Sequence, residues 1–235
     1  MKNKNVKNLR IEHLSTCEPQ SVRQEVAFAE WKRNGNHLVL NGSAGTGKTF
    51  IALYLALETV LDKSNTINKI HLIRSVVPTR EVGFLPGTIN EKLSPYITPY
   101  RIICADLFEN PEAFELLNDS NVIEFHSTSF IRGLTFDDSI IVVDEMQNCT
   151  FHELDSILTR VGENSRVIFC GDYYQSDFVR EKDREGIKKF IEIVYNLNRF
   201  SIIEFDWSDI VRSAFVRDYI MTKEMLERNG KITAH

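Results

Sequence analysis

The sequence predicts a doubly wound α/β domain built on a mostly parallel sheet. Short apolar runs alternate along the chain with longer segments of helical periodicity. The runs 139–145 and 165–172 are apolar at nearly every position before they end in acids, as expected for parallel strands covered on both faces. A glycine-rich stretch follows the run 37–42 directly. This is the end of a strand at which open α/β sheets bind their ligands.

The remaining elements follow the same alternation. The expected strands are 37–42, 69–75, 121–127, 139–145, 165–172 and 200–205. The expected helices include 22–33, 48–61, 151–162 and 210–229, with helical patterns in 88–100 and 111–118 broken by Pro95, Pro99 and Pro111. Residues 1–19, which begin with a basic stretch, are expected to form a flexible N-terminal segment ahead of one domain over 20–235.

Composition limits the classes of protein to consider. The chain has 235 residues, of which 43% are hydrophobic and 26% charged, as in ordinary soluble globular proteins. It carries 28 basic and 33 acidic residues, so any contact with nucleic acid has to come from a local patch. No apolar run approaches the roughly 18 residues of a membrane span, and the start has no apolar signal core. We therefore expect a cytoplasmic protein without membrane association.

The four cysteines predict neither a metal site nor a disulfide framework. Cys17, Cys104, Cys149 and Cys170 are widely scattered, without a C-x-x-C pair or a histidine at metal-ligand spacing. We expect free, buried thiols in a reducing compartment.

The stretch "NGSAGTGKTF" (41–50) fits the phosphate-binding pattern G-x-x-x-x-G-K-[ST]. It joins an expected strand to an expected helix, and a helix N-terminus favours an anion. Lys48 is predicted to reach the β- and γ-phosphates, and the Thr49 hydroxyl to bind Mg²⁺. The predicted nucleotide-binding residues of this loop are Gly42, Ser43, Ala44, Gly45, Thr46, Gly47, Lys48, Thr49 and Phe50.

A pair of acids ends the buried run "SIIVVDE". Asp144 is predicted to hold Mg²⁺, directly or through water, and Glu145 to polarise an attacking water. The alternative is a plain polar strand end. The next run ends in "GDYYQSD", where Gln175 is a candidate sensor of the γ-phosphate; a turn stabilised by Asp172 explains this cluster equally well.

These motifs together resemble the PhoH-like ATPases. "GSAGTGKT", "RSVVPTREVGFLPGTINEKLSPYITP", "SFIRGLTFDDSIIVVDEMQNCT", "LTRVG" and "CGDYYQSD" occur in the family's order, and the resemblance runs from about residue 20 to about residue 220. It implies a RecA-like P-loop core, similar to the first RecA-like domain of superfamily-one helicases. It also implies ATP and Mg²⁺ as ligands, hydrolysis, and a ring-forming oligomer.

The resemblance also carries individual residues. "RQEVAF" looks like the element whose glutamine reads adenine in helicase-like domains, so Gln24 is the candidate and Gln20 the second choice. The chain has Arg74-Ser75 where Arg-Pro is usual in the family, and Met146 where Ala is frequent. The first difference puts the geometry of the 74–80 loop in doubt, and the second leaves the metal site intact.

A single phosphate loop predicts that a second subunit completes the site. An arginine that neutralises charge on the γ-phosphate accelerates hydrolysis by roughly a thousandfold or more, and two-domain motors carry it on a second RecA-like domain. We expect a head-to-tail ring of about six subunits, with Arg212 as the arginine acting in trans and Arg160 as the alternative.

Three functions remain open at this point: a motor or remodeller on RNA or single-stranded DNA, a regulatory ATPase acting on a protein partner, and a small-molecule phosphotransferase. The phosphotransferase is disfavoured because no arginine-rich lid segment is visible. The candidates for contact with nucleic acid are the loop arginines Arg74, Arg80 and Arg132, and the aromatic residues Phe84, Tyr96, Tyr100, Phe130 and Phe136. Solvated loop charges and core packing explain these residues equally well.

Overall fold

The computed structural model describes residues 9–76, 89–172 and 181–229. Their centre is a sheet in which every described pairing is parallel, with the strand order β3-β2-β4-β5-β1-β6. The strands are β1 (His37–Gly42), β2 (Lys69–Arg74), β3 (Ile123–Ser127), β4 (Ser139–Asp144), β5 (Arg166–Gly171) and β6 (Phe200–Phe205). The predicted doubly wound α/β fold is confirmed.

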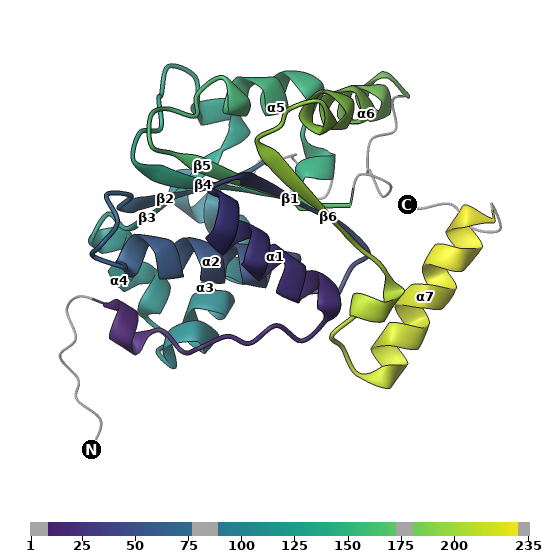
Figure 1. Ribbon diagram of the computed structural model, residues 1–235, viewed down its shortest axis with the longest axis horizontal. Coiled ribbons are helices and arrows are strands. Elements are labelled where there is room, and N and C mark those ends of the chain that lie inside the picture. The colour runs from purple at the N-terminus through teal and green to yellow at the C-terminus, as the bar shows by residue number, and fades with distance from the viewer. Residues whose placement is uncertain (1–8, 77–88, 173–180, 230–235) are drawn as a thin grey trace.

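Helices cover both faces of the sheet (Figure 1). The helices are α1 (Val22–Asn34), α2 (Lys48–Leu61), α3 (Ile89–Phe108), α4 (Ala113–Asp119), α5 (Phe151–Leu158), α6 (Glu181–Tyr195) and α7 (Ala214–Arg228). Helices α1 to α4 lie on one face and α5 and α6 on the other, while α7 stands beside the end of β6. Strand residues alternate between two cores, so that Leu38 and Leu40 pack toward α2 and Val39 packs toward the opposite face.

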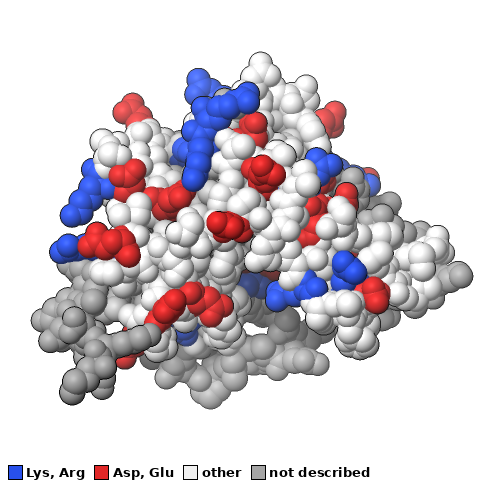
Figure 2. Space-filling model, turned by 60° about the horizontal axis from the view of Figure 1, so that its bottom comes forward, with Lys and Arg blue, Asp and Glu red and all other residues white. Residues whose placement is uncertain are grey.

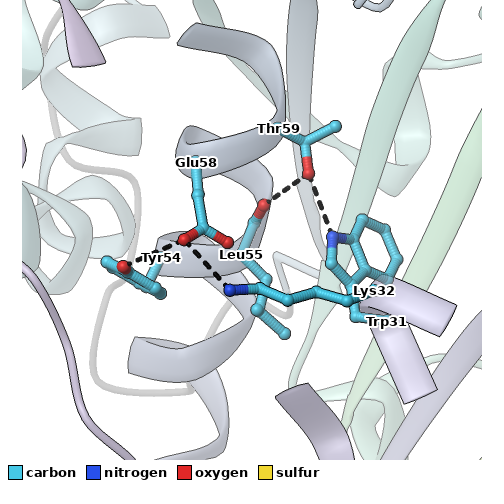
Figure 3. A network of polar contacts seen from close by, with 6 residues as sticks. All are labelled: Trp31, Lys32, Tyr54, Leu55, Glu58 and Thr59. Atoms are coloured by element: carbon cyan, nitrogen blue, oxygen red, sulfur yellow. Dashed lines mark hydrogen bonds and ion pairs between the residues drawn. The ribbon is translucent and has the colours of Figure 1, made fainter. Parts of the chain in front are cut away.

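Helix α2 begins at the phosphate loop, and contacts with α1 hold its later turns in place. Its residues from Ile51 to Leu57 are buried. Trp31 of α1 donates from Nε1 to Thr59 Oγ1 at 3.0 Å, and Lys32 of α1 pairs with Glu58 at 3.4 Å (Figure 3). The Tyr54 hydroxyl also donates to Glu58, at 3.2 Å. These contacts fix the position of the helix whose first turn carries Lys48 and Thr49.

Three elements differ from the sequence predictions by more than two residues. Helix α3 continues through Pro95 and Pro99. Both prolines are exposed, and the opposite side of the helix buries Tyr100 and Cys104, so packing offsets the lost hydrogen bonds. Helix α5 ends at Leu158 because the chain then turns to pair with the 136–138 segment.

The third difference concerns α7, which begins at Ala214 rather than at residue 210. A short 3₁₀ turn, Trp207–Asp209, precedes it, and the Val211 N–H donates to the Gly45 carbonyl at 3.0 Å. Residues 210–213 therefore lie against the phosphate loop in a non-helical conformation.

Several predictions about the chain as a whole can be compared with this structure. All four cysteines are free; Cys104, Cys149 and Cys170 are buried and Cys17 is half-buried. Part of the predicted flexible segment packs: Leu9 and Leu14 contact the core, and the Ser15 N–H donates to the Leu107 carbonyl at 2.8 Å.

No helix in the described segments has the length and apolar character needed to cross a membrane. Figure 2 shows basic and acidic side chains interspersed on one face of the molecule.

Candidate nucleotide site

Most of the predicted site residues that the structure describes meet at the carboxyl edge of the sheet. A cavity of about 580 Å³ lies there, lined by the phosphate loop, Asp144 and Glu145 at the end of β4, and Asp172 after β5. Another cavity, of about 710 Å³, lies near the opposite ends of the strands and is lined by residues such as His37 and Arg166. It contains none of the phosphate-loop residues, so the first cavity is the candidate nucleotide site.

Two glycines of the loop are favoured by their positive φ angles, and one of them also by close packing. A Cβ on Gly42 would lie 1.9 Å from the Phe205 carbonyl oxygen of β6, and the φ angle of Gly42 is +126°. Gly45 has φ +75°, and a Cβ there would lie 3.1 Å from Arg212 and 3.2 Å from Ile220. A side chain at Gly42 would push β6 away from the loop, whereas at Gly45 the positive φ disfavours one and the Arg212 and Ile220 side chains would have to shift.

Lys48 folds back over the loop that precedes it. Its ammonium donates to the carbonyls of Gly42 and Ser43, each at 2.7 Å, and to Thr46 Oγ1 at 3.3 Å. Burial lowers the pKa of Lys48, while neighbouring acids, Asp172 foremost, raise it. To reach a phosphate, the ammonium has to exchange these oxygens for those of a ligand.

Thr49 and Asp144 form the predicted metal-binding pair. Thr49 Oγ1 donates to Asp144 Oδ1 at 2.8 Å, and the Tyr100 hydroxyl donates to Asp144 Oδ2 at 2.9 Å. Asp144 is only 4% exposed. A hydroxyl and a carboxylate beside a phosphate-binding loop are the hard oxygen ligands that Mg²⁺ prefers, together with water and phosphate oxygens. The residues present therefore fit the ion.

Glu145 has the features of a general base. Its φ of 52° places a non-glycine residue in the left-handed region, a conformation that clusters at functional sites. Burial raises the pKa of Glu145, and the charge of Asp144 raises it further. The Gln147 amide donates to its carboxylate, and Gln147 Oε1 accepts from the Asp172 N–H at 3.1 Å. Gln147 thus fixes the Glu145 side chain relative to the end of β5.

Tyr100, Gln147 and Glu224 also belong to the site, although no motif in the sequence marks them. The sequence suggests Tyr100 only for stacking or core packing, whereas in the structure it is fully buried and donates to Asp144. Its spacing from Cys104 and Leu107 marks the buried side of a helix, and a buried tyrosine needs a partner for its hydroxyl. Glu224 of α7 accepts from Ser43 Oγ at 2.9 Å and from Trp207 Nε1 at 2.6 Å. No sequence pattern links it to the loop.

Gln24 lies beneath the loop. It is 4% exposed; its Nε2 donates to the Thr46 carbonyl at 3.0 Å, and its Oε1 accepts from the Gln20 N–H at 2.7 Å. Both ends of the amide are therefore bonded within the chain, and the side chain braces the loop. Its role in reading adenine stays a prediction, as does the alternative at Gln20.

The two candidate arginines differ in position. Arg212 is exposed and, with Lys223, lines the cavity of its own chain. This placement favours a role in the same subunit, and the role in trans that the sequence predicts is the alternative. Arg160 donates from Nε to the Ile131 carbonyl at 2.9 Å and from Nη1 to the Ser156 carbonyl at 2.7 Å, so it acts as a structural cap.

The remaining residues that the sequence suggests for contact with nucleic acid or the γ-phosphate differ in their positions. Arg74 ends β2 opposite Asp144 in the sheet register. Burial lowers the pKa of Arg74, but Tyr100, Asp144 and Glu145 outweigh this effect, so the net shift is upward. Phe136 is buried, whereas Phe130 is 62% exposed and Arg132 is exposed. Gln175, Arg80 and Phe84 lie outside the described residues.

Comparisons with known proteins agree with these motifs. The family model described as PhoH-like protein matches residues 16–224. A PhoH-like protein of Mycobacterium leprae is 36% identical over 76% of this chain and 50% of its own length; one of Bacillus subtilis is 34% identical over 86% of this chain and 62% of its own. The chain thus spans about half to two thirds of these relatives.

Similarities to solved structures are more distant. The large terminase of a thermophilic bacteriophage, in complex with ADP, aligns with a TM-score of 0.49 at 13% identity, covering 89% of this chain and 50% of the terminase. Unliganded Pif1 from Bacteroides aligns with a TM-score of 0.42 at 15% identity, covering 92% and 47%. Similarities at this level carry no argument about activity.

Proposed function

Because the chain belongs to the PhoH-like protein family, we propose that it binds ATP with Mg²⁺ and hydrolyses it at the carboxyl edge of the sheet. The observation that carries this proposal is the 2.8 Å bond between Thr49 and Asp144. It joins the first turn of the phosphate-loop helix to the acidic end of β4, which is the arrangement that P-loop hydrolases use. Bound Mg²⁺ supplies charge neutralisation at the phosphate oxygens.

Each neighbouring residue has a task in this proposal. The loop N–H groups and Lys48 hold the β- and γ-phosphates, and Lys48 leaves the carbonyls of Gly42 and Ser43 to do so. Glu145 accepts a proton from the attacking water, and Gln147 orients its carboxylate. Arg212, at the rim of the same cavity, contacts the γ-phosphate of its own subunit.

We further propose that RNA or single-stranded DNA contacts the segment 128–134. This segment follows the end of β3, at the same edge of the sheet as the nucleotide cavity. Phe130 is 62% exposed and Leu134 40% exposed, with the exposed Arg132 between them. An exposed aromatic ring beside a cation suits a stacked base and its phosphate, and stacking is worth about 1 to 3 kcal/mol per base.

An exposed apolar surface on α7 supports assembly or a protein partner. Phe215 is 81% exposed, Tyr219 63% and Val216 38%, which is unusual for one helix of a soluble protein. These residues follow Arg212 closely in the sequence. We propose that a neighbouring copy in a closed oligomer covers it, and a different protein at this surface is the alternative function.

The test is ATP turnover by the whole chain, measured with and without RNA and single-stranded DNA over a series of protein concentrations. Lys48→Ala removes the cation from the loop and serves as the control for contaminating activity. Phe130→Ala is expected to reduce stimulation by nucleic acid at least roughly threefold. The matched control is Tyr195→Ala, which removes an exposed aromatic residue of α6, and Phe215→Ala tests the α7 surface separately.

The outcomes separate the proposed functions. Loss of stimulation with Phe130→Ala alone supports the contact with nucleic acid. An effect of Phe215→Ala on the concentration dependence of turnover supports assembly through α7. Turnover equal to that of Lys48→Ala under all conditions would overturn the hydrolase, and hydrolysis indifferent to every nucleic acid tested favours the protein partner.

A further inference from the structure

Three potential metal ligands stand together at the β3 edge of the sheet. His71 belongs to β2, and Glu124 and His126 belong to β3, which ends the strand order. His71 pairs with Glu124 in the register, and His126 pairs with Ile73. Because side chains alternate along a strand, residues 71, 124 and 126 share one face. The regular sheet thus brings two imidazoles and a carboxylate together.

The separations of three ligand atoms fit a metal ion. His71 Nδ1 lies 2.9 Å from His126 Nε2, and these nitrogens lie 4.0 Å and 3.7 Å from Glu124 Oε2. Three atoms at these separations lie on a circle whose radius is roughly 2.1 Å, which matches the bond lengths of Zn²⁺ to nitrogen and carboxylate oxygen. An ion near the centre of this circle would be within bonding distance of all three atoms at once.

We propose that His71, Glu124 and His126 bind one divalent transition-metal ion of the Zn²⁺ class. Two imidazoles and one carboxylate suit Zn²⁺ and its neighbours in the first transition series, whereas Mg²⁺ prefers oxygen ligands alone. The Glu124 side chain is 46% exposed, so an ion can enter from solvent and keep a water as a further ligand. None of the three residues lines the nucleotide cavity.

Lys69 is the competitor that the metal has to displace. Its ammonium lies 2.6 Å from Glu124 Oε2 and provides the positive partner of that carboxylate. The two imidazoles share a hydrogen bond without a metal, and the Phe136 ring packs at 4.4 Å from His71 and 5.9 Å from His126. A buried histidine pair with only a structural role would show the same contacts. The two roles differ in their response to Zn²⁺.

The experiment is titration of the tag-free, metal-stripped chain with Zn²⁺, read by competition with a chromophoric chelator. Excess Mg²⁺ occupies the oxygen site at Asp144, and a Cys17→Ser background removes the half-buried thiol. One ion per chain is expected to bind. His71→Gln and His126→Gln should each weaken binding at least roughly tenfold, as should Glu124→Gln. Lys69→Met should strengthen binding, because it removes the competing ammonium.

His37→Asn is the matched control, because it changes a half-buried histidine elsewhere in the sheet and should leave the affinity for Zn²⁺ unchanged. X-ray absorption of the Zn²⁺-loaded parent protein needs no variant and should show two imidazoles and no sulfur around the ion. Stoichiometric binding that survives in folded His71→Gln and His126→Gln variants would overturn the site. Absence of binding at micromolar Zn²⁺, or a coordination shell without imidazole, would do the same.

Discussion

The hydroxyl of Thr49 donates a hydrogen bond to Asp144, although 95 positions separate the two residues in the sequence. Asp144 accepts a second hydrogen bond from Tyr100, so both of its oxygens are held in place. A carboxylate fixed in this way is ready to hold a hard cation beside the phosphate loop.

Asp144→Asn is expected to keep the fold, because the amide oxygen still accepts from Thr49, but to lose Mg²⁺-dependent turnover by at least roughly a hundredfold. The measurement is ATP hydrolysis across a Mg²⁺ series, with thermal unfolding as the check on the fold. Asp106→Asn, an acid on the wall of the same cavity, is the matched control. Parent-like turnover of Asp144→Asn at low Mg²⁺ would show that the ion is held elsewhere.

Glu145→Gln is expected to bind ATP normally and to turn it over at least roughly a hundredfold more slowly, because the amide cannot accept the proton. The parent protein should lose turnover on the acid side as the Glu145 carboxylate is protonated. Since burial and Asp144 raise the pKa of Glu145, this loss should occur above the ordinary glutamate pKa of 4.5. A pH profile of turnover and a nucleotide-binding titration test both statements, and rapid hydrolysis by Glu145→Gln would contradict them.

Tyr100→Phe removes one hydrogen bond from Asp144 and leaves a buried oxygen with one partner fewer. We expect a loss of roughly 1 to 2 kcal/mol in the free energy of unfolding, and a requirement for more Mg²⁺ at half-maximal turnover. Chemical denaturation and a Mg²⁺ titration measure the two effects. Tyr54→Phe, whose hydroxyl bonds to Glu58 away from the cavity, should change stability without changing the Mg²⁺ requirement.

Mixing subunits of two variants tests whether Arg212 acts in its own subunit or in a neighbouring one. Arg212→Ala and Lys48→Ala should each be strongly impaired alone. Because Arg212 lines the cavity of its own chain, mixed assemblies should show no recovery. Turnover measured after confirmed subunit exchange tests this expectation. Recovered activity would instead establish that Arg212 completes the site of a neighbouring subunit.

The unfolding free energy should fall at acid pH because of His37. Burial lowers the pKa of His37 to about 4, and the charges of Arg166 and Arg199 assist. The folded state therefore keeps this histidine neutral, whereas the unfolded chain takes up a proton near pH 6.5. The contribution of His37 to the free energy of unfolding is fully present above about pH 6.5, and it is lost as the pH falls toward 4. After allowance for partial exposure, the effect is about 1 to 2 kcal/mol.

His37→Asn should show a shallower loss of stability over this range than the parent, and the exposed His152→Asn should follow the parent. Denaturant unfolding at several pH values between about 7 and about 4 gives the comparison. Identical slopes for His37→Asn and the parent would rule out His37 as the cause.

The phosphate loop and Asp144 could be predicted because their chemistry depends on local order, in which a strand runs into a loop or an acid at a fixed spacing. Tyr100, Gln147 and Glu224 could not, because they join the site through tertiary packing; Ser43 and Glu224 are 181 positions apart. The subunit in which Arg212 acts also depends on tertiary structure, because residues 210–213 lie against Gly45; its action in trans stays a prediction. Pro95 and Pro99 predict a break in the helix, but the packing of its buried side keeps α3 continuous.

The contacts of Lys48 couple phosphate binding to the internal bonding of the loop. The ammonium has three oxygen partners, which belong to Gly42, Ser43 and Thr46. An anionic phosphate oxygen is a stronger acceptor for an ammonium than a neutral carbonyl, so it can replace them. The carbonyls that Lys48 leaves then need water or another donor as a new partner. Binding of a phosphate therefore exchanges bonds within the loop for bonds to the ligand.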